Sequence, residues 1–303
     1  MHYLQEWTYF KLYVGDRYDA LDWIITDVIG DALNKVGDLP WFYLRYIDEK
    51  GTHLRFRVKL PQEQKNLDKQ LYACLHDNLS AIGILPFNQY TPLISVVGQN
   101  NTFDDRNVDL GIFCEKSIYE PELEKYGGEK GIVIAEKLFH KSSEIAREIL
   151  IQEKTFSLNR KDFVLLLFIC GLDVFLKKQN IQPFLERYAT FWLSGNPAIG
   201  SLKMVFSEQA YELLDTGANI IPEILNFELK NQELIKDWYS ALKEAREAYS
   251  LNANNYSSDM AERLAFHFIH LMNNRLGFNS LEESYLATLL SRIGEMGYNF
   301  ELV

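Results

Sequence analysis

Cysteine is scarce in this chain of 303 residues, and no stretch of it is rich in proline, glycine or serine. The three cysteines, Cys74, Cys114 and Cys170, are odd in number and widely spaced. This usage favours reduced core thiols over a disulfide framework or a zinc site, so we expect no metal. Without a low-complexity or linker-like segment, the chain is expected to be ordered nearly throughout.

Long apolar runs are also missing. The longest, from Phe163 to Gly171, is far shorter than the roughly 20 residues needed to cross a bilayer. The N-terminus has no basic region followed by an apolar stretch, so it does not resemble a signal peptide. We therefore expect a cytoplasmic protein that makes no use of a membrane.

Positive charge is in deficit, with 31 basic against 42 acidic residues and a formal net charge of -11. This balance argues against broad contact with a phosphate backbone, so no direct nucleic-acid partner is expected. The excess of acidic residues does not indicate which other partner the protein binds, because a soluble protein often has such a charge for solubility alone.

Common catalytic and cofactor motifs are absent as well. The chain has no Walker loop, no glycine-rich dinucleotide fingerprint, no Gly-x-Ser-x-Gly elbow and no His-Glu-x-x-His pair. These absences remove most of the support for cofactor chemistry, and we expect no cofactor.

The first part of the chain mixes strands with helices. Aromatic residues alternate over 7–13 and predict a half-buried strand, and apolar residues at helical spacing predict a helix over 18–36. Two strand-like runs, 41–47 and 53–58, are joined by a connection of hairpin length. A helix over 63–82 and two further strand-like runs between 87 and 119 follow.

After Gly128 the pattern becomes mostly helical. Helices are expected near 130–153, 160–178, 181–194, 207–216, 230–250, 258–275 and 281–294. The chain is therefore predicted to be α+β, with an N-terminal, mainly antiparallel sheet and helices over about 1–128 and a C-terminal helical layer over about 129–303. Because no linker separates these parts, we expect a single domain.

Two arginines on the strand over 53–58 could carry chemistry. Arg55 and Arg57 share a face because side chains alternate along a strand, which places the two cations roughly 6 to 7 Å apart. They repel each other unless an anion lies between them. An exposed face with solvated arginines remains the other interpretation of this pattern.

Two further segments contain unusual combinations of residues. His267 and His270 lie three apart on one predicted helix, but no carboxylate or cysteine partner completes a metal site, so a packed or capping histidine is the simpler interpretation. The segment from Tyr119 to Gly128 crowds acids, Lys125 and Tyr126 before a glycine pair that permits a tight turn or close approach to a ligand.

In this order the blocks resemble one known family: the thiopeptide-type bacteriocin biosynthesis domain, which is also the C-terminal glutamate-elimination domain of class I lanthipeptide dehydratases. The resemblance runs from about residue 5 to 293 and rests on Trp7-x-Tyr9-x-Lys11-Leu12-Tyr13, Trp41-Phe42-Tyr43-Leu44-Arg45-Tyr46, His53-Leu54-Arg55-Phe56-Arg57, Tyr119-Glu120-Pro121-Glu122-x-x-Lys125-Tyr126-Gly127-Gly128 and His270-x-x-x-Asn274-Arg275-Leu276-Gly277.

The resemblance implies a lyase that acts on a ribosomally made precursor peptide with a leader. In that family a large domain glutamylates Ser or Thr with glutamyl-tRNA, and the small domain eliminates glutamate to leave dehydroalanine or dehydrobutyrine. This chain is similar to the second part alone, so we expect a stand-alone elimination subunit and a separate tRNA-dependent glutamylating partner.

The resemblance also assigns roles to residues. Arg55 and Arg57 are expected to bind the glutamyl group and stabilise charge, His270 to transfer the proton, and Lys125 to take part in catalysis. Residues expected to bind substrate or shape the site are Arg45, His53, Tyr126, Asn274 and Arg275. Lys125 stands where the family has an arginine; lysine keeps the charge but loses the planar fork.

Two other functions remain open. One is a thiopeptide pyridine synthase, which joins two dehydroalanines in a formal [4+2] cycloaddition and expels the leader peptide. The other is a non-catalytic scaffold that binds the peptide or supports a glutamylating partner. Elimination is the preferred function because Arg55, Arg57 and His270 are retained. Between 86 and 118 the chain is longer than the elimination domains, which predicts a remodelled entrance to the site.

Overall fold

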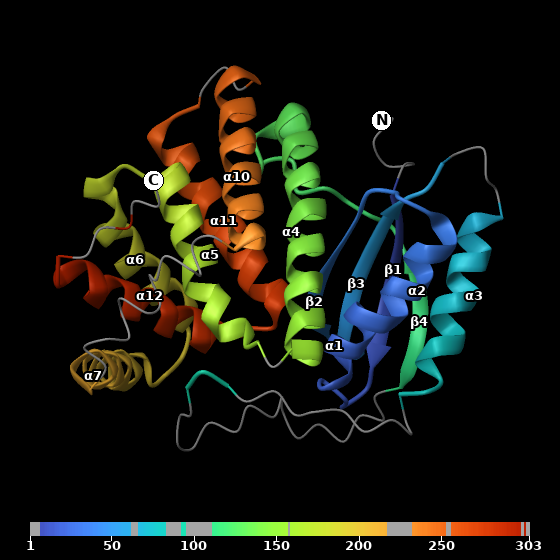
Figure 1. Cartoon of the computed structure of the whole chain (residues 1–303), viewed down its shortest axis with the longest axis horizontal. Helices are drawn as coiled ribbons and strands as arrows, with labels where there is room; N and C mark the ends of the chain where they lie inside the picture. Colours follow the sequence, from blue (N-terminus) through green and yellow to red (C-terminus); the bar gives the residue numbers. More distant parts are fainter. Residues whose placement is uncertain are drawn as a thin grey trace. The chain divides into compact units, whose positions relative to one another are not determined.

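The computed structural model describes residues 7–61, 66–82, 92–94, 111–156, 158–216, 232–252, 256–297 and 300. The chain divides into two compact units, Met1–Pro121 with Ser142–Gln152 and Glu122–Lys141 with Glu153–Val303. Helix α4 (Gly128–Phe156) contributes residues to both (Figure 1). The predicted α+β class is confirmed. The expectation that the two parts pack as a single domain stays a prediction.

The first unit contains an antiparallel sheet. Among the described residues it has four strands in the order β2-β3-β1-β4, with bounds β1 (Trp7–Val14), β2 (Trp41–Asp48), β3 (Gly51–Lys59) and β4 (Ile112–Ser117). The predicted hairpin is confirmed, because β2 and β3 pair from Trp41 opposite Val58 to Asp48 opposite Gly51. Most of the segment from 86 to 111, including the expected remodelled entrance, lies outside the described residues.

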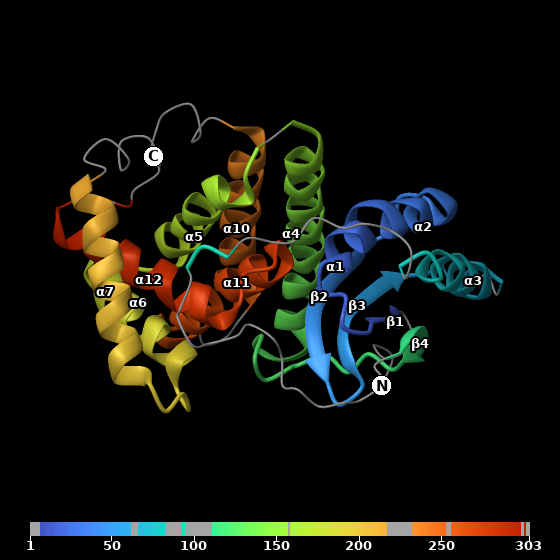
Figure 2. The same ribbon diagram turned by 90° about the horizontal axis from the view of Figure 1, so that it is seen from below.

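Helices cover one face of this sheet (Figures 1 and 2). They are α1 (Ala20–Trp23), a π-helical segment (Ile24–Val28), α2 (Ile29–Val36) and α3 (Leu67–Leu79). The sheet contributes buried apolar side chains to the core of this unit, among them Phe10, Leu12, Leu54 and Phe56. The first three helical segments are continuous and fall within the single helix predicted over 18–36.

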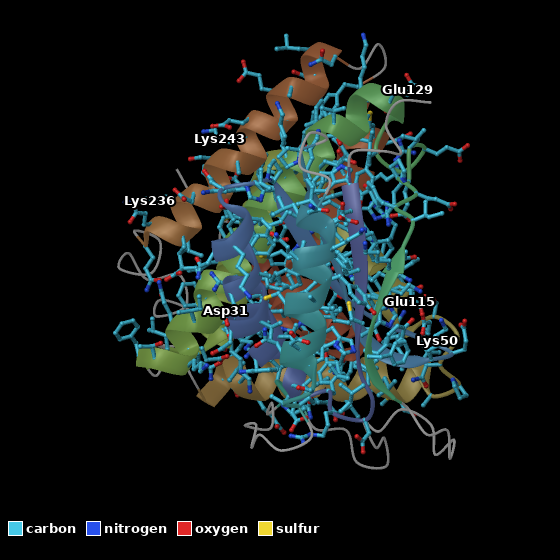
Figure 3. All side chains as sticks on the ribbon, turned by 90° about the vertical axis from the view of Figure 1, so that its right-hand side faces the viewer. Asp31, Lys50, Glu115, Glu129, Lys236 and Lys243 are labelled. Carbon is cyan, nitrogen blue, oxygen red and sulfur yellow. The ribbon has the colours of Figure 1, made fainter. Side chains whose placement is uncertain are left out.

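A surface ion pair links the hairpin turn to the edge strand of the sheet. Lys50, in the β2–β3 turn, donates to Glu115 of β4 at 2.5 Å, and both residues are labelled in Figure 3. Exposed pairs of this kind contribute roughly 0–1 kcal/mol to stability, so the sheet depends mainly on its buried aromatic residues.

The second unit is helical throughout its described elements. Besides α4 these are α5 (Arg160–Phe175), α6 (Lys178–Leu193), α7 (Ile199–Thr216), α10 (Glu233–Asn252), α11 (Ser258–Leu276) and α12 (Ser280–Glu295). Helix α5 carries the longest apolar run, is buried on nearly every side and packs with α10 and α11. Helix α12 packs with α6 and α7. Among the described helices, none has the length and apolar character to cross a membrane.

The ends of the helices follow local signals. The Ser257 side chain caps α11, Asn279 forms a capping box with Glu282 at the start of α12, and Gly277 ends α11 at a φ of 94°. One predicted start was wrong: α7 begins at Ile199, not near 207. Leu202 and Phe206, four residues apart and both buried, extend its apolar face toward the N-terminus.

Gly131, near the start of α4, supports a stability prediction. A Cβ there would lie 1.7 Å from the backbone oxygen of Tyr126, whereas a Cβ at Gly200 of α7 would meet no atom within 4 Å. We expect Gly131→Ala to lower the free energy of unfolding by roughly 3 kcal/mol, because the backbone has to move. Gly200→Ala should leave it unchanged or raise it by up to about 1 kcal/mol.

Urea denaturation of the two variants beside the wild-type protein checks this expectation. Equal midpoints for the two alanine variants would show that α4 relaxes around the new methyl group without cost.

Candidate active site

Arg55 and Arg57 lie on the sheet face opposite the helices α1 to α3. Pairing with β1 places Arg57 opposite Tyr9 and Arg55 opposite Lys11, without a bulge, which confirms that the two arginines share a face. His53 lies on the same face, opposite Tyr13. The predicted clustering of cations on one strand is therefore present in the first unit.

Aromatic rings compensate for the repulsion between these two cations. The Arg55 guanidinium lies over the ring of Tyr46, with its carbon 3.2 Å from the ring centroid. Arg57 lies 4.2 Å from the ring of Tyr9 and 5.1 Å from those of Phe42 and Tyr119. Such cation–π contacts stabilise a guanidinium by about 0.5–2 kcal/mol each. Arg57 is buried and Arg55 is partly exposed, so Arg55 is the more accessible of the two.

A polar cluster adjoins these arginines. Asp48 accepts hydrogen bonds from Lys11 Nζ at 3.1 Å and Tyr13 Oη at 3.0 Å. Burial opposes ionisation of Asp48, but these bonds and one from the backbone N–H of Lys50 prevail and lower its pKa. His53 is fully buried, its Nδ1 is 3.1 Å from the carbonyl of Gly51, and burial lowers its pKa. His53 is therefore placed as a neutral, packed side chain.

Arg45 lies on the other face of the sheet. Its partner in β3 is Leu54, which faces the helices, and its Nη2 donates to Asp22 of α1 at 2.5 Å. The side chain is buried. The structure thus separates Arg45 from Arg55 and Arg57, and a role in substrate binding remains a prediction for it.

In the second unit, His270 lies beside the buried carboxylate of Glu283. Its Nδ1 is 2.8 Å from Glu283 Oε1, and the other carboxylate oxygen accepts from Asn273 Nδ2 at 3.2 Å and from the phenol of Tyr188. The Glu283 side chain is 2% exposed and that of His270 is 27% exposed. The Trp192 ring packs against the imidazole, with centroids 4.5 Å apart.

These contacts fix the orientation of the imidazole and favour one tautomer of its neutral form. Burial and the negative charge of Glu283 raise the pKa of Tyr188 well above its usual value, so its phenol keeps the proton and donates. A buried carboxylate that accepts from three groups is satisfied. In the neutral form of His270, a hydrogen on Nδ1 is donated to Glu283 and Nε2 has the lone pair that can accept a proton.

Around α11, the structure buries two of the other predicted residues. Arg275 is fully buried, with its guanidinium 5.7 Å from the ring centroid of Phe139. Tyr126 is buried against Phe139 and His267, and burial raises its pKa above the usual value. Because both side chains are buried, Arg275 and Tyr126 are better placed to shape the site than to contact a substrate directly.

Lys125 precedes α4, and Asn274 lies in the last turn of α11. Lys125 Nζ is 3.1 Å from a carboxylate oxygen of Glu122 and 5.6 Å from the ring centroid of Tyr126. Asn274 is partly exposed, and its backbone carbonyl accepts from the N–H of Gly277 at the C-cap of α11. The roles predicted for both residues stay predictions.

His267 supports a prediction about acid stability. Burial, helped by the positive charge of Lys125 and by His270 and Arg263, lowers the pKa of His267 from 6.5 to about 3. Between these values the unfolded chain binds a proton that the folded chain does not, so stability falls on acidification, by at most roughly 1.4 kcal/mol per pH unit.

We expect acidification from pH 7 to pH 5 to lower the free energy of unfolding of the wild-type protein by about 1 kcal/mol more than that of His267→Gln, since glutamine does not titrate. Urea denaturation at the two pH values measures the difference. His76→Gln is the matched control, because the side chain of His76 is 60% exposed. A His267→Gln protein with the wild-type pH dependence would contradict the expectation.

The sequence did not single out Glu283, Tyr188 or Asn273, although the structure gathers all three at His270. One local signal was available: the capping box formed by Asn279 and Glu282 fixes the start of α12 and puts Glu283 in its first turn. No sequence spacing could show that this turn meets His270 on α11 and Tyr188 on α6. Within the described residues, no three His, Cys, Asp or Glu side chains are arranged to hold a metal ion.

Solved structures that share this fold at low sequence identity include the following three. The tRNA-dependent lantibiotic dehydratase MibB from Microbispora sp. 107891 is 18% identical with a TM-score of 0.60, over 98% of this chain and 29% of MibB. TsrL is 15% identical with a TM-score of 0.68, over 97% of this chain and 95% of TsrL. The pyridine synthase TbtD from thiomuracin biosynthesis is 14% identical with a TM-score of 0.69, over 96% of this chain and 98% of TbtD.

These likenesses establish the fold, and the chain spans less than a third of the length of MibB. No curated protein sequence matches the chain. The lantibiotic biosynthesis dehydratase C-term family matches residues 7–293, in agreement with the blocks of sequence that suggested it. Because this match covers nearly the whole chain, the protein belongs to the lantibiotic dehydratase C-terminal domain family.

Proposed function

We propose that this protein eliminates glutamate from glutamylated Ser or Thr residues of a ribosomally made precursor peptide, leaving dehydroalanine or dehydrobutyrine. The observation that carries the proposal is the pair of His270 and Glu283, an imidazole held with one nitrogen available to accept a proton. Membership of the dehydratase C-terminal family supports the same reaction class.

The reaction needs a base and stabilisation of two charges. The base takes the Cα proton, the C–H electrons form the Cα=Cβ double bond, and the Cβ–O bond breaks so that glutamate departs with that oxygen as a carboxylate. Negative charge develops on the adjacent carbonyl before the bond breaks and on glutamate as it leaves. Cationic hydrogen-bond donors are therefore suited to both positions.

His270 is assigned to the proton transfer. The Glu283 carboxylate is a positioning group: it holds the ring through Nδ1 and stabilises the imidazolium that forms when Nε2 takes the proton. Donation from Tyr188 and Asn273 keeps Glu283 in place. A base prepared in this way is worth roughly 10²–10⁴-fold in rate.

Arg55 and Arg57 are assigned to the glutamyl group and the developing charge. Glutamate brings carboxylates that a guanidinium binds through two parallel hydrogen bonds, so the substrate itself offsets the repulsion between the two cations. Arg55, partly exposed over Tyr46, suits direct contact, and Arg57, buried among aromatic rings, supports the charge of that face.

The remaining residues have supporting roles in the proposal. Lys125 supplies a positive charge beside Tyr126, and Arg275 and Asn274 maintain the C-terminal end of α11. His53 and Arg45 stabilise the sheet that carries the arginines. We propose no cofactor, because base catalysis and charge stabilisation by the chain's own residues suffice.

Elimination requires a peptide that has already been glutamylated. A tRNA-dependent glutamylating activity, expected as a separate partner subunit, must therefore act before this protein. The leader of the precursor peptide is the element that both activities would recognise.

Pyridine synthesis is the second candidate, because TbtD has this fold over nearly its whole chain. That function would consume an already dehydrated peptide, release its leader and create an aromatic chromophore. A scaffold would change neither peptide and would only raise the activity of its partner.

Mass spectrometry of a synthetic Ser-glutamylated peptide incubated with the purified protein tests the proposal. Loss of the mass of one glutamate, with an alkene that a thiol can trap, is the expected result. An unchanged mass with a suitable leader present would reject elimination, and leader loss from a dehydrated peptide would then establish pyridine synthesis.

A further inference from the structure

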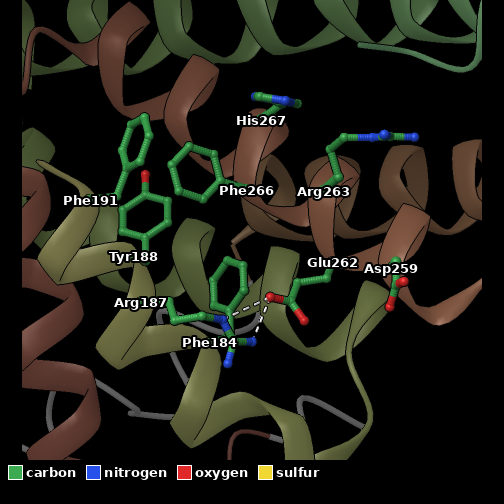
Figure 4. A pocket seen from close by; sticks show the side chains of 9 residues that line it. All are labelled: Phe184, Arg187, Tyr188, Phe191, Asp259, Glu262, Arg263, Phe266 and His267. Carbon is green, nitrogen blue, oxygen red and sulfur yellow. Dashed lines mark hydrogen bonds and ion pairs between the residues drawn. The ribbon is translucent and has the colours of Figure 1, made fainter. Parts of the chain in front are cut away.

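A pocket of about 440 Å³ lies between α6 and α11 in the second unit (Figure 4). Four aromatic side chains line it: Phe184, Tyr188 and Phe191 from α6, and Phe266 from α11. Phe191 and Phe266 meet edge to face, with centroids 4.9 Å apart and planes at 84°. Pockets that bind small groups have volumes of roughly 300–1,000 Å³, and this one is at the lower end of that range.

The charged residues of the pocket cancel one another. Arg187 Nη2 donates to Glu262 Oε1 at 2.5 Å, and Figure 4 shows the two side chains joined by this interaction. Asp259 and Arg263 add one charge of each sign. His267 is neutral because its pKa is lowered to about 3. Because these charges sum to zero, the pocket does not select a ligand of either sign, and its aromatic lining suits a neutral, apolar group.

An aromatic group fits this lining better than an aliphatic one. Aromatic pairs gain about 0.5–1.5 kcal/mol beyond their buried area when rings meet edge to face or offset. Phe191, 54% exposed at the mouth, leaves a large apolar surface in contact with water that an entering ring would cover. A further aromatic ring in the pocket would therefore gain ring–ring contacts with the lining and would cover the exposed apolar surface of Phe191.

The pocket lies on the same helix as His270. Phe266 precedes His270 by four residues, and Arg263, on the pocket wall, precedes it by seven, which correspond to about 6 and 10 Å along α11. Trp192 joins the two places: its ring centroid is 5.8 Å from that of Phe266 and 4.5 Å from that of His270. An extended peptide advances about 3.3 Å per residue, so it covers this interval in about two to three residues.

We propose that this pocket binds an aromatic side chain of the precursor peptide, placed about two to three residues from the glutamylated Ser or Thr. The inference rests on the proposed function, because it takes His270 as the place where the modified residue reacts. It adds a substrate class to that function: peptides with Phe, Tyr or Trp at a fixed offset from each modified position.

Binding of peptides that cannot react tests the pocket separately from catalysis. The probes are short peptides in which alanine replaces the modified serine and a single 4-fluorophenylalanine is moved to successive positions on either side. Fluorine NMR titration with the wild-type protein should show one offset that binds at least about tenfold more tightly than the others.

Three variants identify the pocket as the origin of this preference. Phe191→Ala should reduce the advantage of the favoured offset to about threefold or less, and Phe191→Tyr, which keeps the ring, should retain it. Phe156→Ala is the matched control, since Phe156 is 70% exposed on α4 and does not line the pocket, and it should bind as the wild type does.

The two proposals fail in different ways. Equal binding at every offset, or a preference that persists in Phe191→Ala, would overturn the pocket even if glutamate elimination proceeds. A preference that Phe191→Ala abolishes, in a protein that leaves glutamylated peptides intact, would retain the pocket as a peptide site and overturn elimination.

Discussion

The His270→Ala protein should leave a Ser-glutamylated peptide nearly unchanged under conditions in which the wild-type protein removes the glutamate. We expect the rate of elimination to fall by roughly 10²–10⁴-fold, because the imidazole that accepts the Cα proton is gone while the charge-stabilising groups stay. Mass spectrometry at successive times measures the rate, and anisotropy of a labelled peptide should show binding within about twofold of the wild type, well under 1 kcal/mol.

Two further variants distinguish loss of the base from loss of structure. His76→Ala removes an exposed histidine from the first unit and should eliminate at the wild-type rate. Glu283→Gln keeps the imidazole but loses its carboxylate partner, so kcat should fall by about 10–100-fold with little change in KM. Elimination by His270→Ala at a rate near that of the wild type would refute the assignment of the base.

Replacement of Arg55 by alanine is the second large effect that we expect. A charge-assisted hydrogen bond contributes about 1.5–3 kcal/mol, so loss of the contact between Arg55 and the glutamyl carboxylate should lower kcat/KM by roughly 10–100-fold. Arg55→Lys should recover part of the loss, since it restores the charge but not the planar fork. The ratio of kcat/KM values for the glutamylated peptide measures both effects.

The control for Arg55 is an exposed arginine far from it in the sequence. Arg246→Ala, on the surface of α10, loses the same side chain and should retain full activity. If Arg55→Ala eliminates glutamate as fast as Arg246→Ala does, the glutamyl group is bound elsewhere. Activity of Arg55→Ala on an already dehydrated peptide, with release of its leader, would instead support pyridine synthesis.

Part of the site could be predicted because it depends on local geometry. Alternation along a strand put Arg55 and Arg57 on one face, and pairing with β1 agrees. Alternation alone could not place Arg45, because the face of β2 to which it points depends on the register of the hairpin, in which Arg45 pairs with Leu54. It therefore faces the helices and pairs with Asp22.

The histidine site shows the same division. The sequence showed that His267 and His270 have helical spacing, and it favoured a packed histidine over a metal ligand. The contact between the rings of His267 and Tyr126 agrees with this interpretation. The partner of His270 was not visible, because Glu283 reaches it from another helix.

By itself the sequence determined most of the described helices and strands, with the start of α7 as an exception, and the family to which the chain belongs. These features depend on residues close together along the chain, whose spacing is written in the sequence. Only the tertiary structure decided that a buried carboxylate orients His270, that aromatic rings hold Arg57 and that a pocket adjoins the histidine. Each of these depends on contacts between residues far apart in the sequence, and such contacts form only when the apolar faces of separate elements pack together.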